Sequence, residues 1–146
     1  MQKKSDNSYG IIPVFKKDDG EYIFLIVLHG EGKHWAFPKG HPLQNEAAID
    51  TAKRELYEET GITDCVIPEN ITFEENYSFE QDGRKVNKTV TYFLGFTGNQ
   101  KIETSKEFKP EISENRWVSY DEALRLITYD EAKDMLKKVI LFLTSN

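Results

Sequence analysis

Three glutamates, Glu55, Glu58 and Glu59, lie within five consecutive residues of this chain. On a helix, at about 100° per residue, their side chains fall within an arc of roughly 100°. Like charges at this spacing repel one another, and the neighbouring cations, Lys53 and Arg54, are too few to separate them. A divalent cation would relieve the repulsion. Because carboxylate oxygens suit Mg²⁺ or Mn²⁺, whereas zinc favours His and Cys, we expect a magnesium site, with manganese as the alternative.

A solvated, charged helix face is the ordinary explanation of such a run, and the wider spacing decides against it. Gly40 is followed after five residues by Glu46 and after seven more by Arg54-Glu55, and the run ends at Gly61 and an apolar residue. Seven identities and two apolar positions are fixed. At average residue usage, the odds of a chance match are well below about one in a million. We therefore interpret this segment as a functional site.

The segment resembles the signature of the Nudix hydrolases, in which the same glycines, glutamates and arginine occur at the same spacing. The resemblance implies a loop-helix-loop motif and a pyrophosphohydrolase whose substrate is a nucleoside diphosphate linked to a further group. The metal ligands that it implies are the main chain of Gly40 and the side chains of Glu55, Glu58 and Glu59. Arg54 cannot bind a cation, so we expect it to orient a carboxylate through a bidentate pair, with Glu46 as the partner.

Hydrolysis of a phosphoanhydride also needs a base that takes a proton from the attacking water. In this family the base comes either from the helix or from a later loop. We favour Glu58, with Glu111 as the loop alternative. Glu111 stands five residues before Arg116, which resembles the place of an additional metal ligand in diadenosine tetraphosphate hydrolases, and Glu114 competes for this role. The candidate catalytic residues are therefore Glu58, Glu55, Arg54 and Glu111.

Three further segments resemble the branch of the family that acts on dinucleoside polyphosphates. Residues 34–41 contain its His-Trp, two residues, Pro-Lys-Gly-His pattern, and residues 88–93 are similar to a later strand of that branch. Tyr77 lies sixteen residues beyond Gly61, as a tyrosine does in this branch, whereas the ADP-ribose branch carries a nearby proline that is missing here. The resemblance implies that diadenosine tetraphosphate is cleaved to ATP and AMP.

Such a substrate requires cations along its phosphates and aromatic faces for its bases, each stacked base contributing about 1–3 kcal/mol. Tyr77 and Tyr129 are the stacking candidates, although each could equally be a core residue. The full set of substrate-binding candidates is His34, Trp35, Lys39, His41, Tyr77, Lys88 and Tyr129.

Two other functions are open at this stage. An RNA 5'-end pyrophosphohydrolase shares the Trp, one residue, Phe-Pro pattern, but typically continues with Gln-Gly-Gly where this chain has Lys39-Gly40-His41. A catalytically inactive Nudix domain could instead sense nucleotides, although the intact glutamates argue against it. Turnover of a nucleotide with magnesium would separate the enzymes from the sensor.

Composition limits the class of protein. We expect one domain, residues 1–146. A net charge of −6 argues against a long nucleic acid partner but leaves nucleotide-sized substrates open. The first residues lack the apolar stretch of a signal peptide, and the single Cys65 cannot form an internal disulfide, so we expect a cytoplasmic protein. No apolar run is long enough to cross a bilayer, and the oligomeric state is not encoded in any pattern that we identify.

The elements that must position these residues follow from hydrophobic patterning. Strands at 8–16 and 22–28 flank the turn signal Asp19-Gly20, a short extended piece covers 35–37, and a second hairpin joins 71–79 to 88–96. The signature helix should begin near Asn45 as N-cap and end at Gly61. A strand at 116–118, a helix at 121–127 capped by Ser119 and a helix at 130–143 complete the chain. We therefore predict an α+β fold, a three-layer α/β/α sandwich with a mixed sheet and the loop-helix-loop motif of the Nudix hydrolases.

Overall fold

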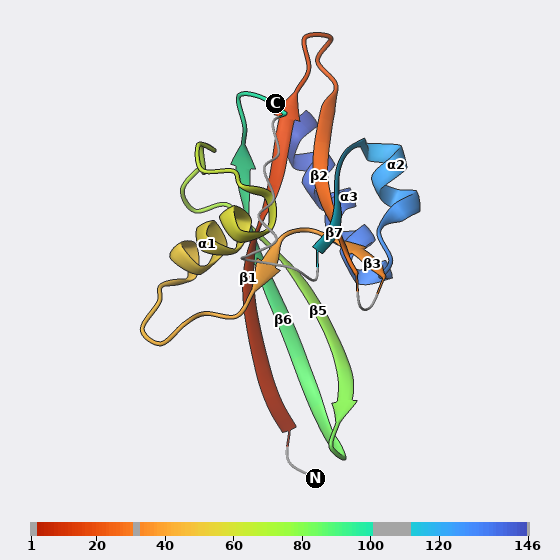
Figure 1. The fold of residues 1–146 in the computed structure, drawn as a ribbon. Helices are drawn as coiled ribbons and strands as arrows, with labels where there is room; N and C mark the ends of the chain where they lie inside the picture. Colours follow the sequence, from red (N-terminus) through yellow and green to blue (C-terminus); the bar gives the residue numbers. More distant parts are fainter. Residues whose placement is uncertain (1–2, 31–32, 101–111, 146) are drawn as a thin grey trace.

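A seven-stranded mixed sheet forms the middle layer of the computed structural model, which describes residues 3–30, 33–100 and 112–145 (Figure 1). The strands are β1 (Lys3–Lys16), β2 (Tyr22–His29), β3 (His34–Ala36), β4 (Lys39–Gly40), β5 (Thr72–Gln81), β6 (Arg84–Phe96) and β7 (Ile112–Ser119). The helices are α1 (Ala48–Thr60), α2 (Tyr120–Leu126) and α3 (Asp130–Thr144).

The strands lie in the order β3-β2-β1-β6-β5. In this order β1 and β6 are parallel, and the other neighbouring pairs are antiparallel. Strand β4 pairs with β1 at Tyr9 and Gly10, and β7 pairs with β2 along most of its length. Beyond the body of the molecule, β1, β5 and β6 continue as a long arm that carries the N-terminal end (Figure 1). The segment from β3 to α1 therefore crosses the base of this arm.

Alternate side chains of the central strands build two cores on opposite faces of the sheet. Ile11 and Leu25 pack against Leu56 of α1 on one face. Their neighbours Ile12 and Phe24 point the other way, into the core that contains the apolar side of α3. Because a helix covers each face, the chain forms the predicted three-layer α/β/α arrangement.

The elements predicted from the sequence are present. The short strand β4 was not predicted, β5 and β6 extend further toward their shared turn, and β1 and β7 gain longer additions. Strand β1 begins at Lys3 rather than at residue 8, because its first half pairs in parallel with β6 from Lys85 onward. Strand β7 covers eight residues rather than three, because it pairs along β2. Both additions depend on a partner strand that is remote in the sequence, which local patterning does not reveal.

The signature helix α1 ends as predicted but begins differently. Gly61 adopts φ 78°, and its N–H donates to the carbonyl of Tyr57, which is the left-handed stop expected there. The prediction that Asn45 caps the helix is wrong. Asn45 has φ 63° and lies in a turn, and α1 starts after Ala47 without a side-chain cap. The Oε1 of Glu46 accepts from the Leu43 N–H and from the Thr51 hydroxyl instead, which fixes the chain before the helix.

Candidate active site

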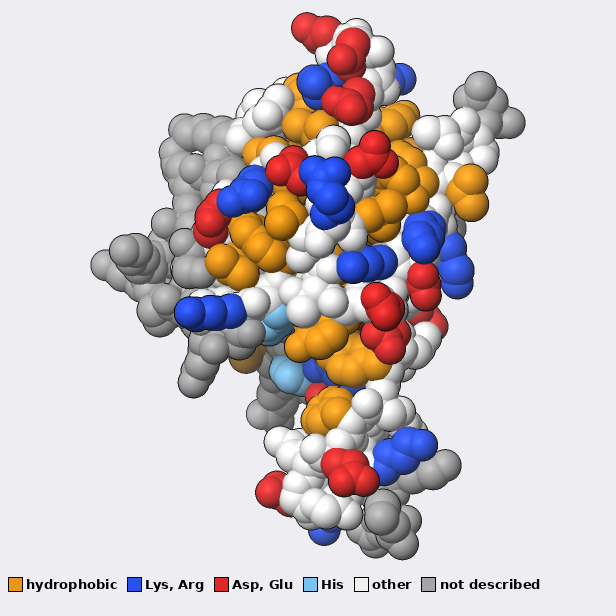
Figure 2. Space-filling view, turned by 90° about the vertical axis from the view of Figure 1, so that its right-hand side faces the viewer, with side chains coloured by type: hydrophobic (Ala, Val, Ile, Leu, Met, Phe, Trp, Pro, Cys, Tyr) orange, Lys and Arg blue, Asp and Glu red, His pale blue; other side chains and the backbone are white. Residues whose placement is uncertain are grey.

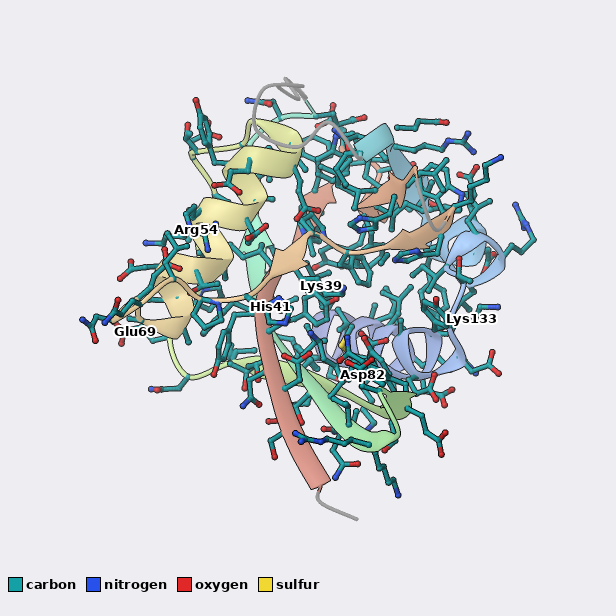
Figure 3. All side chains as sticks on the ribbon, turned by 60° about the horizontal axis from the view of Figure 1, so that its bottom comes forward. Lys39, His41, Arg54, Glu69, Asp82 and Lys133 are labelled. Atoms are coloured by element: carbon teal, nitrogen blue, oxygen red, sulfur yellow. The ribbon has the colours of Figure 1, made fainter. Side chains whose placement is uncertain are left out.

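Arg54 links helix α1 to the loop that follows β4. Its Nε and Nη2 donate to the two carboxylate oxygens of Glu46 at 2.9 and 3.0 Å, which confirms the expected bidentate pair. Nη2 also donates to the carbonyl of His41 at 2.9 Å. The guanidinium lowers the pKa of Glu46 to about 2, first through this side-chain hydrogen bond. Figure 3 shows Arg54 on the helix and His41 and Lys39 on the neighbouring segment.

The remaining nitrogen of Arg54 lies between two of the signature carboxylates. Nη1 donates to Glu55 Oε2 at 3.0 Å and lies 3.3 Å from both oxygens of Glu58. Glu55 and Glu59 are almost fully buried, 4% and 1% exposed, whereas the Glu58 side chain remains 22% exposed. Glu59 is also anchored from β7, since the Asn115 amide donates to its main-chain carbonyl at 3.0 Å. Helix α1 thus presents one accessible and two buried carboxylates on one side.

Gly40 lies directly against this carboxylate group. A Cβ on Gly40 would fall 2.2 Å from Glu55 Oε2 and 2.6 Å from Oε1, which no real side chain could tolerate without displacing the carboxylate. Only glycine therefore lets the main chain of β4 approach Glu55 so closely. The structure thus brings together four of the five ligands expected from the sequence, namely Gly40, Glu55, Glu58 and Glu59.

This donor set fits a hard divalent cation. It consists of carboxylate oxygens and a main chain that no Cβ screens from Glu55, and oxygen donors are those that Mg²⁺ and Mn²⁺ prefer. Among the described residues, no three His, Cys, Asp or Glu side chains have their ligand atoms gathered around one point. Arg54 Nη1 lies between Glu55 and Glu58 and bonds to both. A bound cation would therefore require these carboxylates to turn toward one another.

A cleft of about 370 Å³ opens over the carboxylates. Besides the four candidate ligands and Arg54, it is lined by two lysines, three other polar residues and one leucine. These further lining residues are Ser8, His29, Lys39, His41, Leu43 and Lys88. Opposite charges thus face each other across the cleft, which suits a phosphate chain held beside a carboxylate-bound cation.

Lys88 is fixed at the rim of this cleft by the N-terminal half of β1. Its Nζ donates to Ser8 Oγ at 2.7 Å and to Asp6 Oδ2 at 3.1 Å, and only 6% of the residue is exposed. His41 Nε2 lies 2.8 Å from Asp6 Oδ1. Burial opposes ionisation of Asp6, but the hydrogen bonds with Lys88 and His41 outweigh it and lower the pKa. Sequence reasoning missed Asp6 and Ser8, because the parallel pairing of Asp6 with Lys88 joins residues 82 positions apart.

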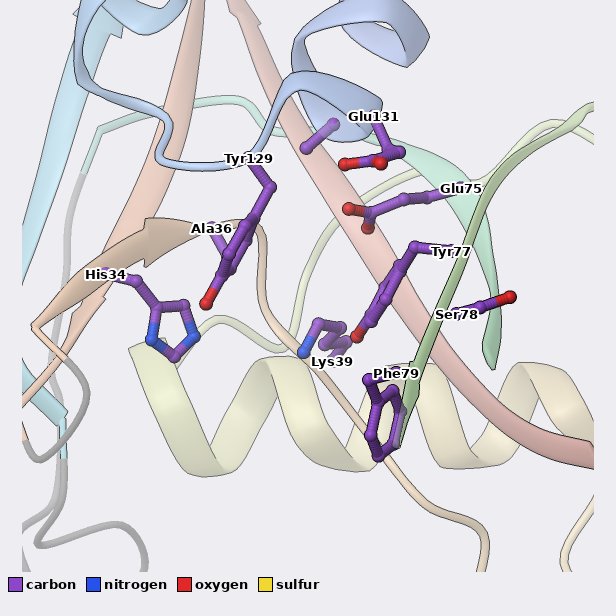
Figure 4. A pocket seen from close by; sticks show the side chains of 10 residues that line it. His34, Ala36, Lys39, Glu75, Tyr77, Ser78, Phe79, Tyr129 and Glu131 are labelled. Atoms are coloured by element: carbon purple, nitrogen blue, oxygen red, sulfur yellow. The ribbon is translucent and has the colours of Figure 1, made fainter. Parts of the chain in front are cut away.

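A second cavity, of about 540 Å³, lies between β3, β5 and the start of α3. The rings of Tyr77 and Tyr129 face each other across it, 6.5 Å between centroids and 13° from parallel, and His34 lies 5.6 Å from Tyr129. Figure 4 shows the two rings with Lys39 near their hydroxyl ends. The space-filling view of this side shows histidine side chains beside hydrophobic ones (Figure 2). The structure therefore brings the two stacking candidates together in one pocket.

The two cavities are adjacent and share Lys39, which lines both. Burial lowers the pKa of Lys39, and the nearby carboxylates of Glu75, Glu59 and Glu55 act in the opposite direction. Glu75, a buried member of the aromatic cavity, was not identified from the sequence. The alternation of β5 indicates that Glu75 and Tyr77 share one face of the strand. No neighbouring residue indicates that this face forms the wall of a pocket.

The structure does not place three other predicted residues in either cavity. Trp35 lines neither cavity, because its neighbours His34 and Ala36 face the aromatic pocket and adjacent strand residues point to opposite sides. Its ring lies beneath the Arg116 guanidinium, 5.1 Å away. Glu111 lies outside the described residues. Glu114, its competitor, pairs with Arg116 at 2.8 Å.

Comparison with known proteins identifies a family match over most of the chain. Residues 5–139 match the NUDIX domain. The bis(5'-nucleosyl)-tetraphosphatase [asymmetrical] of Rattus norvegicus is 35% identical over 133 residues, covering 89% of this chain and 86% of the relative. An RNA pyrophosphohydrolase of Bartonella henselae is 26% identical and covers 80% of this chain and 75% of that protein.

A solved structure supports the same relationship. The C. elegans Ap4A hydrolase, in a binary complex, superposes with a TM-score of 0.79 at 27% identity. The superposition covers 94% of this chain and 97% of that chain. The mixed sheet, its helical layers and the order of the elements are therefore shared along almost the whole length.

Proposed function

This chain belongs to the NUDIX family of hydrolases, and from that premise we propose that it cleaves dinucleoside polyphosphates with the help of a divalent metal ion. Diadenosine tetraphosphate, cleaved to ATP and AMP, is the proposed reaction. One observation carries the proposal: a carboxylate-lined cleft and a tyrosine-lined pocket adjoin at Lys39. A nucleotide with a long phosphate chain needs such a pair of sites. Two similar proteins support the proposal: the rat relative is named a bis(5'-nucleosyl)-tetraphosphatase [asymmetrical], and the C. elegans protein is named an Ap4A hydrolase.

The aromatic pocket would take one base. Carbon atoms in contact lie about 3.5–4.0 Å apart, so a planar base between two rings needs about 7 Å. The 6.5 Å between the centroids of Tyr77 and Tyr129 is close to that width, and a small opening of the pocket would admit the base. With the base there, the phosphates run past Lys39 toward the cleft.

In the cleft, the residues of α1 would perform the chemistry. Glu55, Glu58, Glu59 and the main chain of Gly40 would hold the metal. Bound Mg²⁺ or Mn²⁺ would supply positive charge against the phosphate oxygens and lower the pKa of a water molecule. Arg54 keeps Glu55 and Glu58 oriented through Nη1.

We assign the role of base to Glu58, which would accept a proton from the attacking water on a carboxylate oxygen. Its side chain is 22% exposed and therefore reachable by water, whereas Glu55 and Glu59 are almost fully buried. Lys39 and Lys88 would neutralise the phosphates that leave with ATP. The aromatic pocket holds a nucleobase on only one side of the carboxylates. Water should therefore attack a phosphate away from the midpoint of a symmetric substrate.

The remaining expectations are consistent with this proposal. We propose residues 1–146 as a single domain, of which 5–139 match the family. A net charge of −6 favours small nucleotides over long nucleic acids, and we propose a cytoplasmic location. Among the described helices, none has the length and apolar character needed to span a bilayer.

Chromatography of the products after incubation with diadenosine tetraphosphate and Mg²⁺ tests the proposal. ATP and AMP are expected in equal amounts. Glu59→Gln should reduce the rate by orders of magnitude, whereas the matched control Glu74→Gln, on the exposed face of β5, should not. Two equivalents of ADP would contradict the asymmetric reaction. Inertness toward the dinucleotide, with release of pyrophosphate from triphosphorylated RNA, would favour the alternative RNA 5'-end activity; the Bartonella relative is named an RNA pyrophosphohydrolase.

A further inference from the structure

Glu75 places a buried carboxylate in the wall of the aromatic pocket. It precedes Tyr77 by two positions on β5, so both side chains point to the same face of the strand. The residue is only 4% exposed and lines the cavity. Figure 4 shows its carboxylate directed into the space beside the two tyrosine rings, at the end away from Lys39.

The protein does not compensate for this buried carboxylate with a hydrogen bond. In residues 3–30, 33–100 and 112–145, no group donates to the Glu75 oxygens, and no lysine or arginine forms an ion pair with them. Burial raises the pKa of Glu75, the more distant Lys39 and Lys88 lower it, and Glu131 raises it further. The Glu75 oxygens face the cavity, so a ligand that brings N–H groups there would supply the donors that the protein does not.

The arrangement of the pocket indicates which nucleobase would supply these N–H groups. A planar base between Tyr77 and Tyr129 would direct an edge toward Glu75, while its phosphates lie near Lys39 at the opposite end. An ionised carboxylate offers two acceptor oxygens and no donor. The Watson–Crick edge of guanine offers two adjacent donors, N1–H and N2–H, whereas that of adenine offers one donor beside an acceptor.

We propose that Glu75 determines the base specificity of this subsite by accepting both Watson–Crick donors of guanine, so that guanine nucleotides bind in preference to adenine nucleotides. The proposal rests on the proposed function, since it names the base within the class of dinucleoside polyphosphates. Guanine-containing dinucleoside tetraphosphates are then better substrates than diadenosine tetraphosphate.

Binding of GMP and AMP, measured by calorimetry, tests this specificity without any hydrolysis, because neither nucleotide contains a phosphoanhydride. A bidentate pair discriminates by about 1–3 kcal/mol, so wild-type protein should bind GMP at least about fivefold more tightly than AMP. Glu75→Gln should lose or reverse this preference, since a glutamine amide pairs bidentately with adenine. Glu74→Gln removes a charge from the adjacent, outward-facing residue and should keep the wild-type ratio.

Equal affinities in the wild-type protein, tighter binding of AMP, or an unchanged ratio in Glu75→Gln would each overturn the proposal. Hydrolysis separates this result from the wider proposal. The ratio of kcat/KM for diguanosine and diadenosine tetraphosphate should follow the binding ratio. If neither dinucleotide is cleaved but the preference for GMP and its loss in Glu75→Gln persist, the proposed function fails and the assignment of Glu75 stands.

Discussion

Substitution of Gly40 by alanine isolates the contact between β4 and the catalytic helix. The added Cβ would lie 2.2 Å from both the Cδ and the Oε2 of Glu55. Ordinary carbon contacts are about 3.5–4.0 Å, so the carboxylate would have to move by more than about 1 Å. Gly40 does not have a positive φ, and its backbone therefore accepts alanine without strain. The clash with Glu55 is thus the dominant effect of the change.

The structure sets the expected size of the two effects. A misplacement of about 1 Å in a catalytic group can cost about 100-fold in rate, which corresponds to about 2.7 kcal/mol of activation free energy. Overpacking costs about 1–3 kcal/mol of folding stability, and the low end is expected here because the displaced atoms are the end of a flexible side chain. Gly40→Ala should therefore remain folded while losing most of its activity.

Two measurements check this prediction. Initial rates with diadenosine tetraphosphate and Mg²⁺ give the loss in kcat, and thermal unfolding with and without Mg²⁺ gives the stabilisation by bound metal. Wild-type protein should gain Tm with Mg²⁺, and Gly40→Ala should gain little. Gly98→Ala is the matched control, because no atom lies within 4 Å of its added Cβ. Activity within about threefold of wild type, with an unchanged metal-dependent Tm, would refute the argument.

Three other predictions concern substrate binding and stability. Tyr77→Ala and Tyr129→Ala should each raise KM by the equivalent of one stacked base, about 1–3 kcal/mol; a fall in Tm with unchanged KM would indicate a core role instead. Lys88→Met should lower kcat more than Lys138→Met on the exposed side of α3, and equal rates would remove Lys88 from the phosphate site. Because the folded state lowers the pKa of Glu46 from 4.5 to about 2, its contribution to stability is complete above pH 4.5 and disappears as the pH falls toward 2. Urea unfolding of Glu46→Gln should accordingly show a smaller loss of stability over that interval, and the same slope as wild type would contradict this role.

The chemistry of α1 could be predicted from the sequence because it depends on local geometry. Residues three and four apart on a helix lie on one side, so the grouping of Glu55, Glu58 and Glu59 follows from their spacing. The stop at Gly61 and the pair of Arg54 with Glu46 depend on the same short stretch of chain. The two hairpins were likewise encoded in neighbouring residues, because a turn signal separates the two strands of each.

Tertiary structure alone decided what surrounds that helix. The parallel pairing of β1 with β6 places Asp6 beside Lys88, and no local pattern indicates that register. The way β3 pairs in the sheet decides which of its faces meets the aromatic pocket, so that His34 lines this pocket and Trp35 points to the other side. Burial of Glu75 depends on the approach of α3 to β5, which brings Tyr129 opposite Tyr77. Local spacing determines which side chains lie together along one helix or strand. Many pairings of remote elements satisfy the same local pattern, so the pairing that forms is the one with the lowest free energy for the whole fold.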